Sequence, residues 1–264
     1  MLETFLDGED RLTLAQISRD SGLSKNKTFR ILSTLEKHRL VKRDEVGAYH
    51  LGVRFLDFGQ RVRREMGLLE ASRPVLDWLV EQTRETVFLG VVDGSEALCV
   101  DMRESPQSIR LFAEVGRRAP LYTGGVPKVL LAFLPEEERD AMLETIELKP
   151  ITPHTITDRR TLEKLLRVIR NQGYIVTADD LDVGAHSIAA PILDHRGKVI
   201  AAISVAGPSN RFTDEHIQRY VKLIRQGAAQ ISRALGYRGS YPTAGSHMDP
   251  DFPSKDPSAN VPAQ

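Results

Sequence analysis

The residues best suited to chemistry lie between Ser24 and Arg43. This segment carries seven basic side chains and a single acidic one, Glu36, although the whole chain has a formal net charge of +0. A local positive field of this kind attracts a polyanion. Asn26 can form two hydrogen bonds to adenine, and Arg30 can form two to guanine. The segment therefore predicts contact with double-stranded DNA, and a solvated helix face without a partner is the alternative.

Two short helices must position these side chains. The first is expected over Leu14–Asp20, and the second runs from Lys25 to about His38 after Ser24, a favourable N-cap residue. A rotation of about 100° per residue separates an apolar stripe from a polar stripe on the second helix. The apolar stripe consists of Thr28, Ile31, Leu32 and Leu35, and the polar stripe consists of Asn26, Arg30, Ser33 and Lys37.

Two β-like stretches follow the second helix, at Leu40–Arg43 and Ala48–Leu51. A hairpin at this place would be the wing of a winged helix-turn-helix, whose second helix enters the major groove. A small structural helical hairpin is the alternative. Phosphates are expected at the start of the second helix, and the wing is expected to reach the adjacent backbone or minor groove. The predicted DNA-binding residues are Ser24, Lys25, Asn26, Lys27, Thr28, Arg30, Ser33, Lys42, Arg43 and Tyr49.

A second candidate site begins at the paired glycines Gly124 and Gly125. They precede a predicted helix over Val126–Phe133, and glycines let backbone N–H groups approach a ligand closely. A tight turn is the alternative. Ser187 and Ser204 supply hydroxyl groups among small alanines, which either leave a cavity or allow close packing of a helix on a sheet. We expect Ser187 and the Gly125 region to hold a carboxylate together.

The chain beyond residue 86 alternates between strands and helices. Strands are expected at 87–92, 97–103, 109–112, 174–177, 187–193 and 198–206. Helices are expected at 126–133, 135–147, 161–172 and 214–235. This order is typical of an antiparallel sheet covered by helices, so the fold class is α+β. The proline- and serine-rich stretch Gly236–Gln264 is expected to be a disordered tail.

Three stretches of the chain resemble the isocitrate lyase regulator (IclR) family of bacterial transcription factors. LTLAQISRDSGLSKNKTFRILSTLEKHRLVKRDEVGAYHLG is similar to the winged helix-turn-helix of that family. PLYTGGVPKVLLAFLP is similar to its ligand-loop segment, and DVGAHSIAAPILDHRGKVIAAISVAGPSNRFT is similar to its C-terminal signature. The resemblance covers residues 1–237. It departs from the family at Tyr122, where His is common, at Pro127, where Gly is common, and at Ser187, where some members have Cys.

The resemblance implies a sequence-specific transcriptional regulator whose operator binding responds to a small organic or aromatic acid. It implies a winged helix-turn-helix over 1–52, a helical linker over 53–72, a GAF-like effector-binding domain with an antiparallel sheet over 73–237, and a tail over 238–264. The family has a full helix before residue 14, so either the true start lies upstream or this helix is clipped. The implied effector-binding positions are Leu111, Ala119, Gly124, Gly125, Val126, Asp182, Ser187 and Ser204.

The same resemblance implies a homodimer or homotetramer on a pseudo-palindromic operator. A repressor is expected, although the residues themselves do not fix the sign of regulation.

The sequence also shows that no apolar run approaches the roughly 18 residues of a membrane span, and that the acidic start is unlike a signal peptide. We therefore expect a cytoplasmic protein.

An enzyme is the main rival class, and a purely architectural DNA-binding protein is the third. The seven histidines lack the HxxxH and HExxH spacings of a metal site, and no Walker A or GxGxxG run is present. Cys99, the single cysteine, lies in an apolar strand and is expected to be a buried small hydrophobe. Ser187 lies outside a GxSxG motif. No catalytic residue, metal or cofactor is expected.

Overall fold

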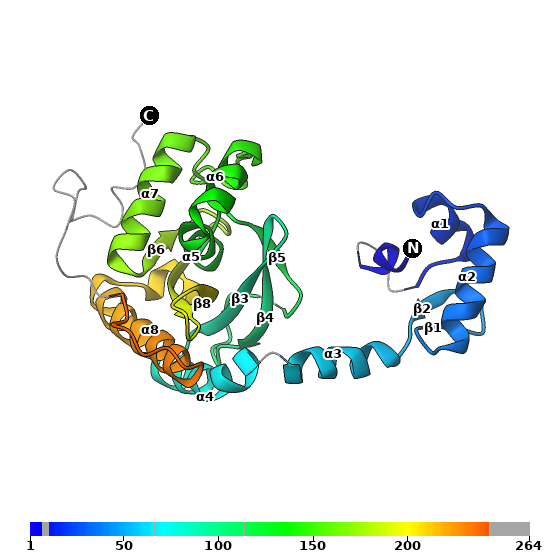
Figure 1. Cartoon of the computed structure of the whole chain (residues 1–264), viewed down its shortest axis with the longest axis horizontal. Helices are drawn as coiled ribbons and strands as arrows, with labels where there is room; N and C mark the ends of the chain where they lie inside the picture. The colour runs from blue at the N-terminus through cyan, green and yellow to red at the C-terminus, as the bar shows by residue number, and fades with distance from the viewer. Residues whose placement is uncertain (7–10, 66, 113, 243–264) are drawn as a thin grey trace. The chain divides into compact units, whose positions relative to one another are not determined.

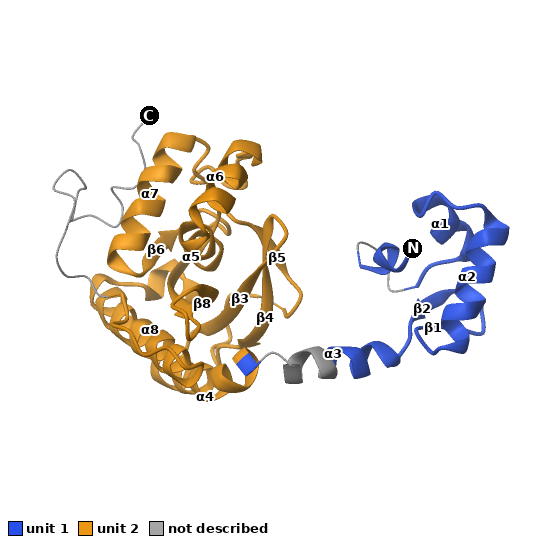
Figure 2. Ribbon diagram, in the orientation of Figure 1, with its two compact units in different colours: residues 1–67 blue, residues 68–264 orange. Residues whose placement is uncertain are grey.

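The computed structural model describes residues 1–6, 11–65, 67–112 and 114–242, without the side chains of residues 60–65. The chain divides into two compact units, unit 1 over Met1–Gly67 and unit 2 over Leu68–Gln264 (Figure 2). Each unit has its own core. Among the described residues, no helix is both long enough and apolar enough to cross a membrane.

Unit 1 is a helix-turn-helix followed by a two-stranded hairpin. A 3-10 turn, η1, spans Leu2–Phe5, and the other elements are α1 (Leu14–Asp20), α2 (Lys25–Lys37), β1 (Val41–Arg43), β2 (Tyr49–Leu51) and α3 (Arg54–Glu65). Thr13 and Gln16 form a reciprocal capping box that begins α1. The small core consists of Phe5, Leu12, Ile17, Leu32, Val41 and Tyr49. The winged helix-turn-helix expected from the sequence is present.

Gly52 closes the hairpin against the end of α2. Its N–H donates to the Leu40 carbonyl oxygen at 2.8 Å. A Cβ at this position would lie 2.0 Å from the carbonyl oxygen of Arg39. Only glycine therefore lets the chain leave β2 and enter α3 along this path.

Unit 2 is built on a six-stranded antiparallel sheet in the order β5-β4-β3-β8-β7-β6. The strands are β3 (Thr86–Asp93), β4 (Glu96–Arg103), β5 (Arg118–Pro120), β6 (Ile175–Ala178), β7 (Ala185–Leu193) and β8 (Val199–Pro208). The helices are α4 (Gly67–Thr83), α5 (Gly125–Phe133), α6 (Glu136–Thr145), α7 (Arg159–Gln172) and α8 (Asp214–Ala234), and a 3-10 turn, η2, spans Ser209–Arg211. The α+β class is confirmed.

Helices cover both faces of this sheet (Figure 1). On one face α8 packs against β7 and β8, and it also packs tightly on α4, because a Cβ at Gly227 would lie 2.8 Å from Val75 Cγ1. On the other face α5 lies across β3, β7 and β8, with α7 packed against α5. The helix α5 is almost wholly buried, so its N-terminus is held firmly against the sheet.

Three expectations differ from the structure. Residues 109–112 form no strand, because Ile109 and Phe112 are three-quarters exposed in a loop, and β5 instead begins at Arg118. Leu68 and Leu69 of α4 are buried in unit 2, so this unit begins before residue 73.

The third difference concerns the expected tail. The Tyr241 hydroxyl donates to the Pro191 carbonyl oxygen, and Arg225 Nη2 donates to that of Pro242 at 3.1 Å. The first residues of the stretch expected to be disordered are therefore fixed on unit 2. Residues 243–264 lie outside the described residues.

Candidate DNA-binding surface and ligand pocket

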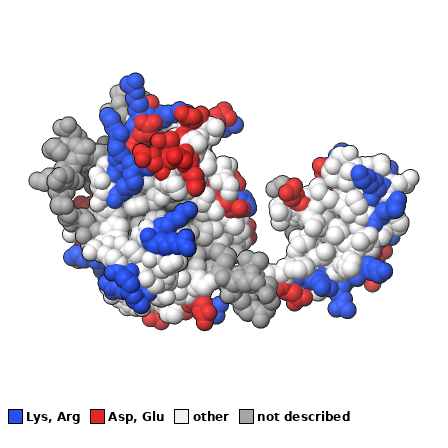
Figure 3. Space-filling view, viewed as in Figure 1, with Lys and Arg blue, Asp and Glu red and all other residues white. Residues whose placement is uncertain are grey.

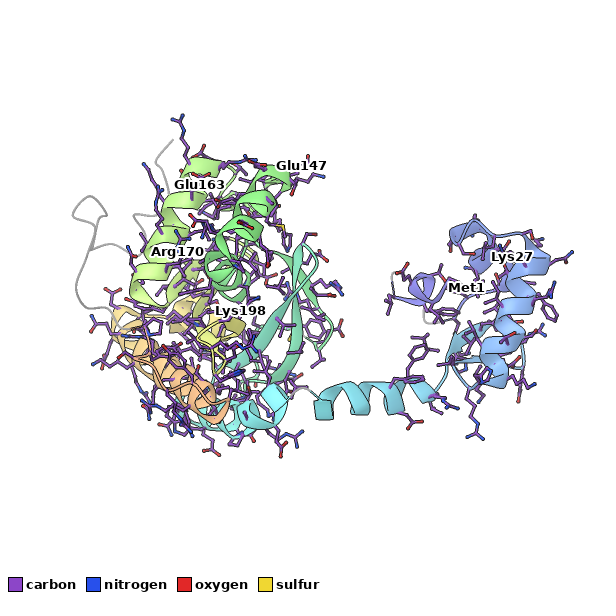
Figure 4. All side chains as sticks on the ribbon, in the orientation of Figure 1. Met1, Lys27, Glu147, Glu163, Arg170 and Lys198 are labelled. Atoms are coloured by element: carbon purple, nitrogen blue, oxygen red, sulfur yellow. The ribbon has the colours of Figure 1, made fainter. Side chains whose placement is uncertain are left out.

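Helix α2 exposes a polar and basic face. Burial of Leu32 and Thr28 in the core of unit 1 fixes the rotation of the helix, and the predicted residues Lys25, Asn26, Lys27, Arg30 and Ser33 are all exposed. The Lys27 side chain points outward from the first turn of α2 (Figure 4). Figure 3 shows Lys and Arg side chains at several places along the edge of this unit. The sequence thus places donors for bases and phosphates on one accessible helix face.

Ser24 is the N-cap residue of α2, and its backbone is extended with φ −64° and ψ 148°. The side chain is exposed and makes no capping hydrogen bond to the described helix N–H groups. The hydroxyl and the first N–H groups of α2 are thus free to meet a phosphate, which a helix N-terminus favours.

Two of the predicted DNA-binding residues are buried, which corrects their assignment. Thr28 is fully buried, because it lies on the apolar stripe of α2 beside Leu32. Tyr49 is 2% exposed and belongs to the core of unit 1, where Leu12 pairs with it across an isolated β-bridge. Neither side chain can reach DNA in this conformation, and both instead support the surface that carries the other residues.

The wing presents its two basic residues differently. The Arg43 guanidinium lies 5.6 Å from the centroid of the Tyr49 ring, and its Nε donates to the Gly47 carbonyl oxygen at 3.3 Å. Lys42 pairs with His50 across the hairpin and is exposed. Arg43 is therefore oriented by contacts within the wing, whereas Lys42 presents an exposed charge suited to phosphate contact.

Unit 2 contains a cavity of about 110 Å³ between α5, the sheet and two loops. All eight predicted effector-binding residues line it: Leu111, Ala119, Gly124, Gly125, Val126, Asp182, Ser187 and Ser204. They come from two loops, from the start of α5 and from the strands β5, β7 and β8. The fold therefore brings the predicted set together around one space, whose remaining wall is largely apolar.

The sheet contributes one face to this cavity. Directly paired residues of antiparallel strands lie on the same face, and Phe88 pairs with Ser204 while Ser187 pairs with Ala206. Gly90 shares this face by the two-residue alternation along β3, and Thr177 shares it because it pairs with Ser187. Apart from Phe88, the residues at these positions are small and leave space under α5, whereas Ala189 and Ala202 are packed in the core beneath the helix.

The paired glycines allow the start of α5 to approach the sheet. Gly124 has φ +62°, in the left-handed region that favours glycine. A Cβ at Gly125 would lie 2.5 Å from Ser187 Oγ and 3.0 Å from Ala189 Cβ. Gly125 is thus required for close packing against β7, and the tight turn and the close approach both occur here.

A buried ion pair stabilises this end of the cavity. Lys128 Nζ contacts Asp180, and the two side chains are only 3% and 8% exposed. The Gly124 N–H donates to the same Asp180 oxygen at 3.0 Å. Asp180 therefore neutralises Lys128 and caps the turn before α5. Sequence reasoning missed this pair, although a lysine within the apolar run VPKVLLAF was a signal for a buried partner.

Arg117, Cys99 and His186 also line the cavity and were not predicted. Arg117 Nη2 contacts both carboxylate oxygens of Asp182, at 3.0 and 3.1 Å. Burial and the nearby Asp101 carboxylate raise the pKa of the Cys99 thiol to about 11. Burial lowers the pKa of His186, which stacks on Phe212, although Asp179 opposes that shift. Near pH 7 the thiol and the imidazole are therefore both neutral.

Within the described parts of the chain, no three His, Cys, Asp or Glu side chains are grouped so that they could hold a metal ion.

A winged helix-turn-helix with an exposed basic helix, joined in one chain to a sheet domain with an apolar cavity, defines a ligand-responsive DNA-binding regulator. Two domain families match the chain. "IclR helix-turn-helix domain" matches residues 1–45, and "Bacterial transcriptional regulator IclR C-terminal" matches residues 60–233. The chain belongs to the IclR family of bacterial transcriptional regulators.

Relatives with known roles support this membership. The chain is 37% identical over 237 residues to the HTH-type transcriptional regulator KipR of Bacillus subtilis, covering 90% of this chain and 94% of the relative. It is 32% identical to KdgR of Escherichia coli, covering 89% and 90%. These relatives are transcriptional regulators, and the chain is a DNA-binding transcriptional regulator rather than an enzyme.

Solved structures agree with the fold. The Thermotoga maritima IclR structure superposes with a TM-score of 0.73 at 32% identity, covering 89% of this chain and 96% of that one. An IclR homologue from Microbacterium hydrocarbonoxydans superposes with a TM-score of 0.80 at 26% identity, covering 89% and 95%. That homologue was crystallised in complex with 4-hydroxybenzoate.

Proposed function

We propose that this chain binds an operator through α2 and the wing, and that a small organic or aromatic acid in the cavity of unit 2 changes its operator affinity. The observation that carries the proposal is that one chain combines an exposed basic recognition helix with a cavity lined by all eight predicted effector positions. The 4-hydroxybenzoate complex of the Microbacterium homologue supports an aromatic acid as the ligand class. We place this action in the cytoplasm, where the operator DNA of a bacterial regulator lies.

The DNA side of the proposal assigns separate roles along α2 and the wing. Asn26 and Arg30 read base edges in the major groove, with Ser33 beside them, while Ser24, Lys25 and Lys27 hold phosphates. Lys42 and Arg43 contact the flanking backbone. One half-site is too short for high specificity, so two copies bind a pseudo-palindrome with half-sites about one helical turn apart. The assembly is a homodimer or homotetramer.

Replacing Arg30 with alanine is expected to weaken cognate binding by about 1–3 kcal/mol and to relax base preference, because a bidentate contact to guanine is lost. The measurement is a footprint and a titration on the DNA upstream of the chain's own gene. Lys37→Ala is the matched control, since this exposed lysine ends α2, where it interacts with the helix dipole. Unchanged affinity and unchanged base preference in Arg30→Ala would contradict the assignment.

The ligand side of the proposal follows from the wall of the cavity. Phe88, Leu98, Leu111 and Val126 supply apolar contacts, and a few polar groups fix the orientation of a ligand. Ligand binding must stabilise one of two conformations that differ in DNA affinity. The helical connector over residues 55–86 is the element proposed to differ between them. AllR of Escherichia coli, 34% identical, is a transcriptional repressor, which supports a repressor here.

A thermal-shift screen of organic and aromatic acids on the full chain tests the ligand class, because a ligand that binds only the folded state raises the melting temperature by an amount that grows with its concentration relative to its Kd. Ser187→Leu is expected to abolish the shift, because a leucine at this place would occupy part of the cavity that Ser187 lines. Lys222→Leu, on the surface of α8, is a control with the same added side chain. A Ser187→Leu protein that binds the acid as tightly as the wild type would exclude this cavity.

A further inference from the structure

The charged side chains of the cavity are distributed unevenly. Among the described lining residues, those with a formal charge are Arg117, Asp180 and Asp182, and Arg117 is the only cation. His186 is neutral near pH 7 because burial lowers its pKa. A carboxylate entering this cavity therefore meets two carboxylates and one guanidinium. The position of its negative charge depends on which of these groups is already satisfied.

The end of the cavity at α5 already holds a carboxylate. Asp180 accepts from the Gly124 N–H at 3.0 Å and contacts the buried Lys128, so the positive groups at this end are occupied. A second carboxylate beside Ser187 and Gly125 would lie close to the Asp180 charge in a poorly solvated space, which is unfavourable. Ser187 and Ser204 remain available as neutral hydrogen-bonding groups. This end suits a hydroxyl or carbonyl group of a ligand better than its carboxylate.

Arg117 is in a different situation. Its Nη2 contacts both oxygens of Asp182, and its Nη1 donates to the Phe112 carbonyl oxygen at 3.2 Å. The Arg117 and Asp182 side chains are 35% and 36% exposed, whereas the Lys128 and Asp180 side chains are almost completely buried. An ion pair that is partly solvated contributes little net stability, so exchange of one carboxylate for another costs little. Asp182 can turn into water when it leaves.

We propose that Arg117 binds the carboxylate of the ligand and that this carboxylate takes the place of Asp182. The inference rests on the proposed function and names the group that selects acids in the cavity. The guanidinium keeps its Phe112 contact and exchanges one ion pair for another, in the bidentate geometry that arginine forms with carboxylates. Asp182 acts as an internal competitor. It lies in the segment 179–184, which carries the exposed Val183. Displacement of Asp182 by a ligand would therefore link occupancy of the cavity to the conformation of this exposed segment.

The test uses benzoate and 4-hydroxybenzoate, each beside its neutral amide, with calorimetry on the full-length protein. Arg117→Gln is expected to weaken acid binding by about tenfold or more and to leave amide binding nearly unchanged, because a charge-assisted contact is lost. Asp182→Asn is expected to strengthen acid binding several-fold, since the competitor loses its charge. The ratio of the affinity for the acid to the affinity for its amide separates an anchoring role from a structural one, because a distorted cavity would weaken the binding of both ligands.

Arg118→Gln is the matched control. Arg118 is adjacent in sequence and half-exposed, but it pairs with Asp93 and Glu96 and is not part of the cavity wall. The Arg118→Gln protein should bind both acids as tightly as the wild type does. If the wild type binds acids and Arg117→Gln keeps its acid-to-amide ratio, or if Asp182→Asn binds acids no more tightly, the anchor assignment is overturned while the proposed function stands. If the wild type binds neither acid, the aromatic-acid class of the proposed function is overturned together with the anchor assignment.

Discussion

Lys128→Met is expected to lower the free energy of unfolding of unit 2 by about 3–5 kcal/mol, because it leaves the Asp180 carboxylate buried without its counterion. Methionine retains the length of the side chain, so the loss reports the charge and not an empty space. The chain has a single tryptophan, Trp78 on α4 of unit 2. Urea denaturation followed by its fluorescence therefore reports this unit selectively.

Two further variants distinguish this cause from a general effect. Lys128→Met combined with Asp180→Asn should recover much of the stability, because the neutral amide oxygen still accepts from the Gly124 N–H. Lys149→Met removes an exposed pair with Glu147 and should leave the denaturation midpoint unchanged. A double variant as unstable as Lys128→Met alone would show that the ion pair is not the source of the loss.

Leu32→Ala is expected to destabilise unit 1 by about 2–5 kcal/mol, since it removes a fully buried side chain from α2 and leaves a cavity. The core of this unit has few large residues, so a loss of this size approaches the whole stability of a small domain. We expect DNA binding and amide protection of α1 and α2 to disappear. The transition reported by Trp78 should remain where it is, because unit 2 has its own core.

Glu36→Ala provides the control on the same helix. Glu36 is exposed, and alanine is the better helix former, so the fold of unit 1 should be retained. Amide hydrogen exchange measured on both variants separates the two outcomes. Protected α1 and α2 amides in Leu32→Ala would mean that packing around Leu32 contributes little to the winged helix-turn-helix.

The elements with a clear hydrophobic period could be predicted from the sequence. Helix α2 was expected over 25–38 and spans Lys25–Lys37, because Leu32 and its neighbours recur at helical spacing. The strand predicted at 109–112 was wrong, because three apolar residues among four (Ile109, Leu111 and Phe112) do not by themselves distinguish a strand from an exposed loop. Thr28 shows the same limit, since a small polar residue on an apolar stripe was assigned to DNA although the stripe predicted its burial.

The pocket could be predicted only in part. Its eight expected members follow from the family resemblance, and they meet in one cavity of the structure. Its charges did not follow, because Arg117 and Asp182 are 65 residues apart and Lys128 and Asp180 are 52 apart. No local pattern links side chains at such separations. Only the pairing of β4 with β5, the packing of α5 on the sheet and the path of the loop before β7 bring them together.

The small residues on the α5 side of the sheet have a consequence for engineering. Thr177, Ser204 and Ala206 line the cavity, while the residues between them on β8, such as Val205, are buried on the opposite face. Longer side chains at these three positions would make the cavity smaller, and more polar ones would change the hydrogen bonds that it offers to a ligand. Neither change would alter the pairing of the strands or unit 1. A library built at these sites would change which compound is detected while the promoter stays the same, and this is the separation of functions that a genetically encoded biosensor requires.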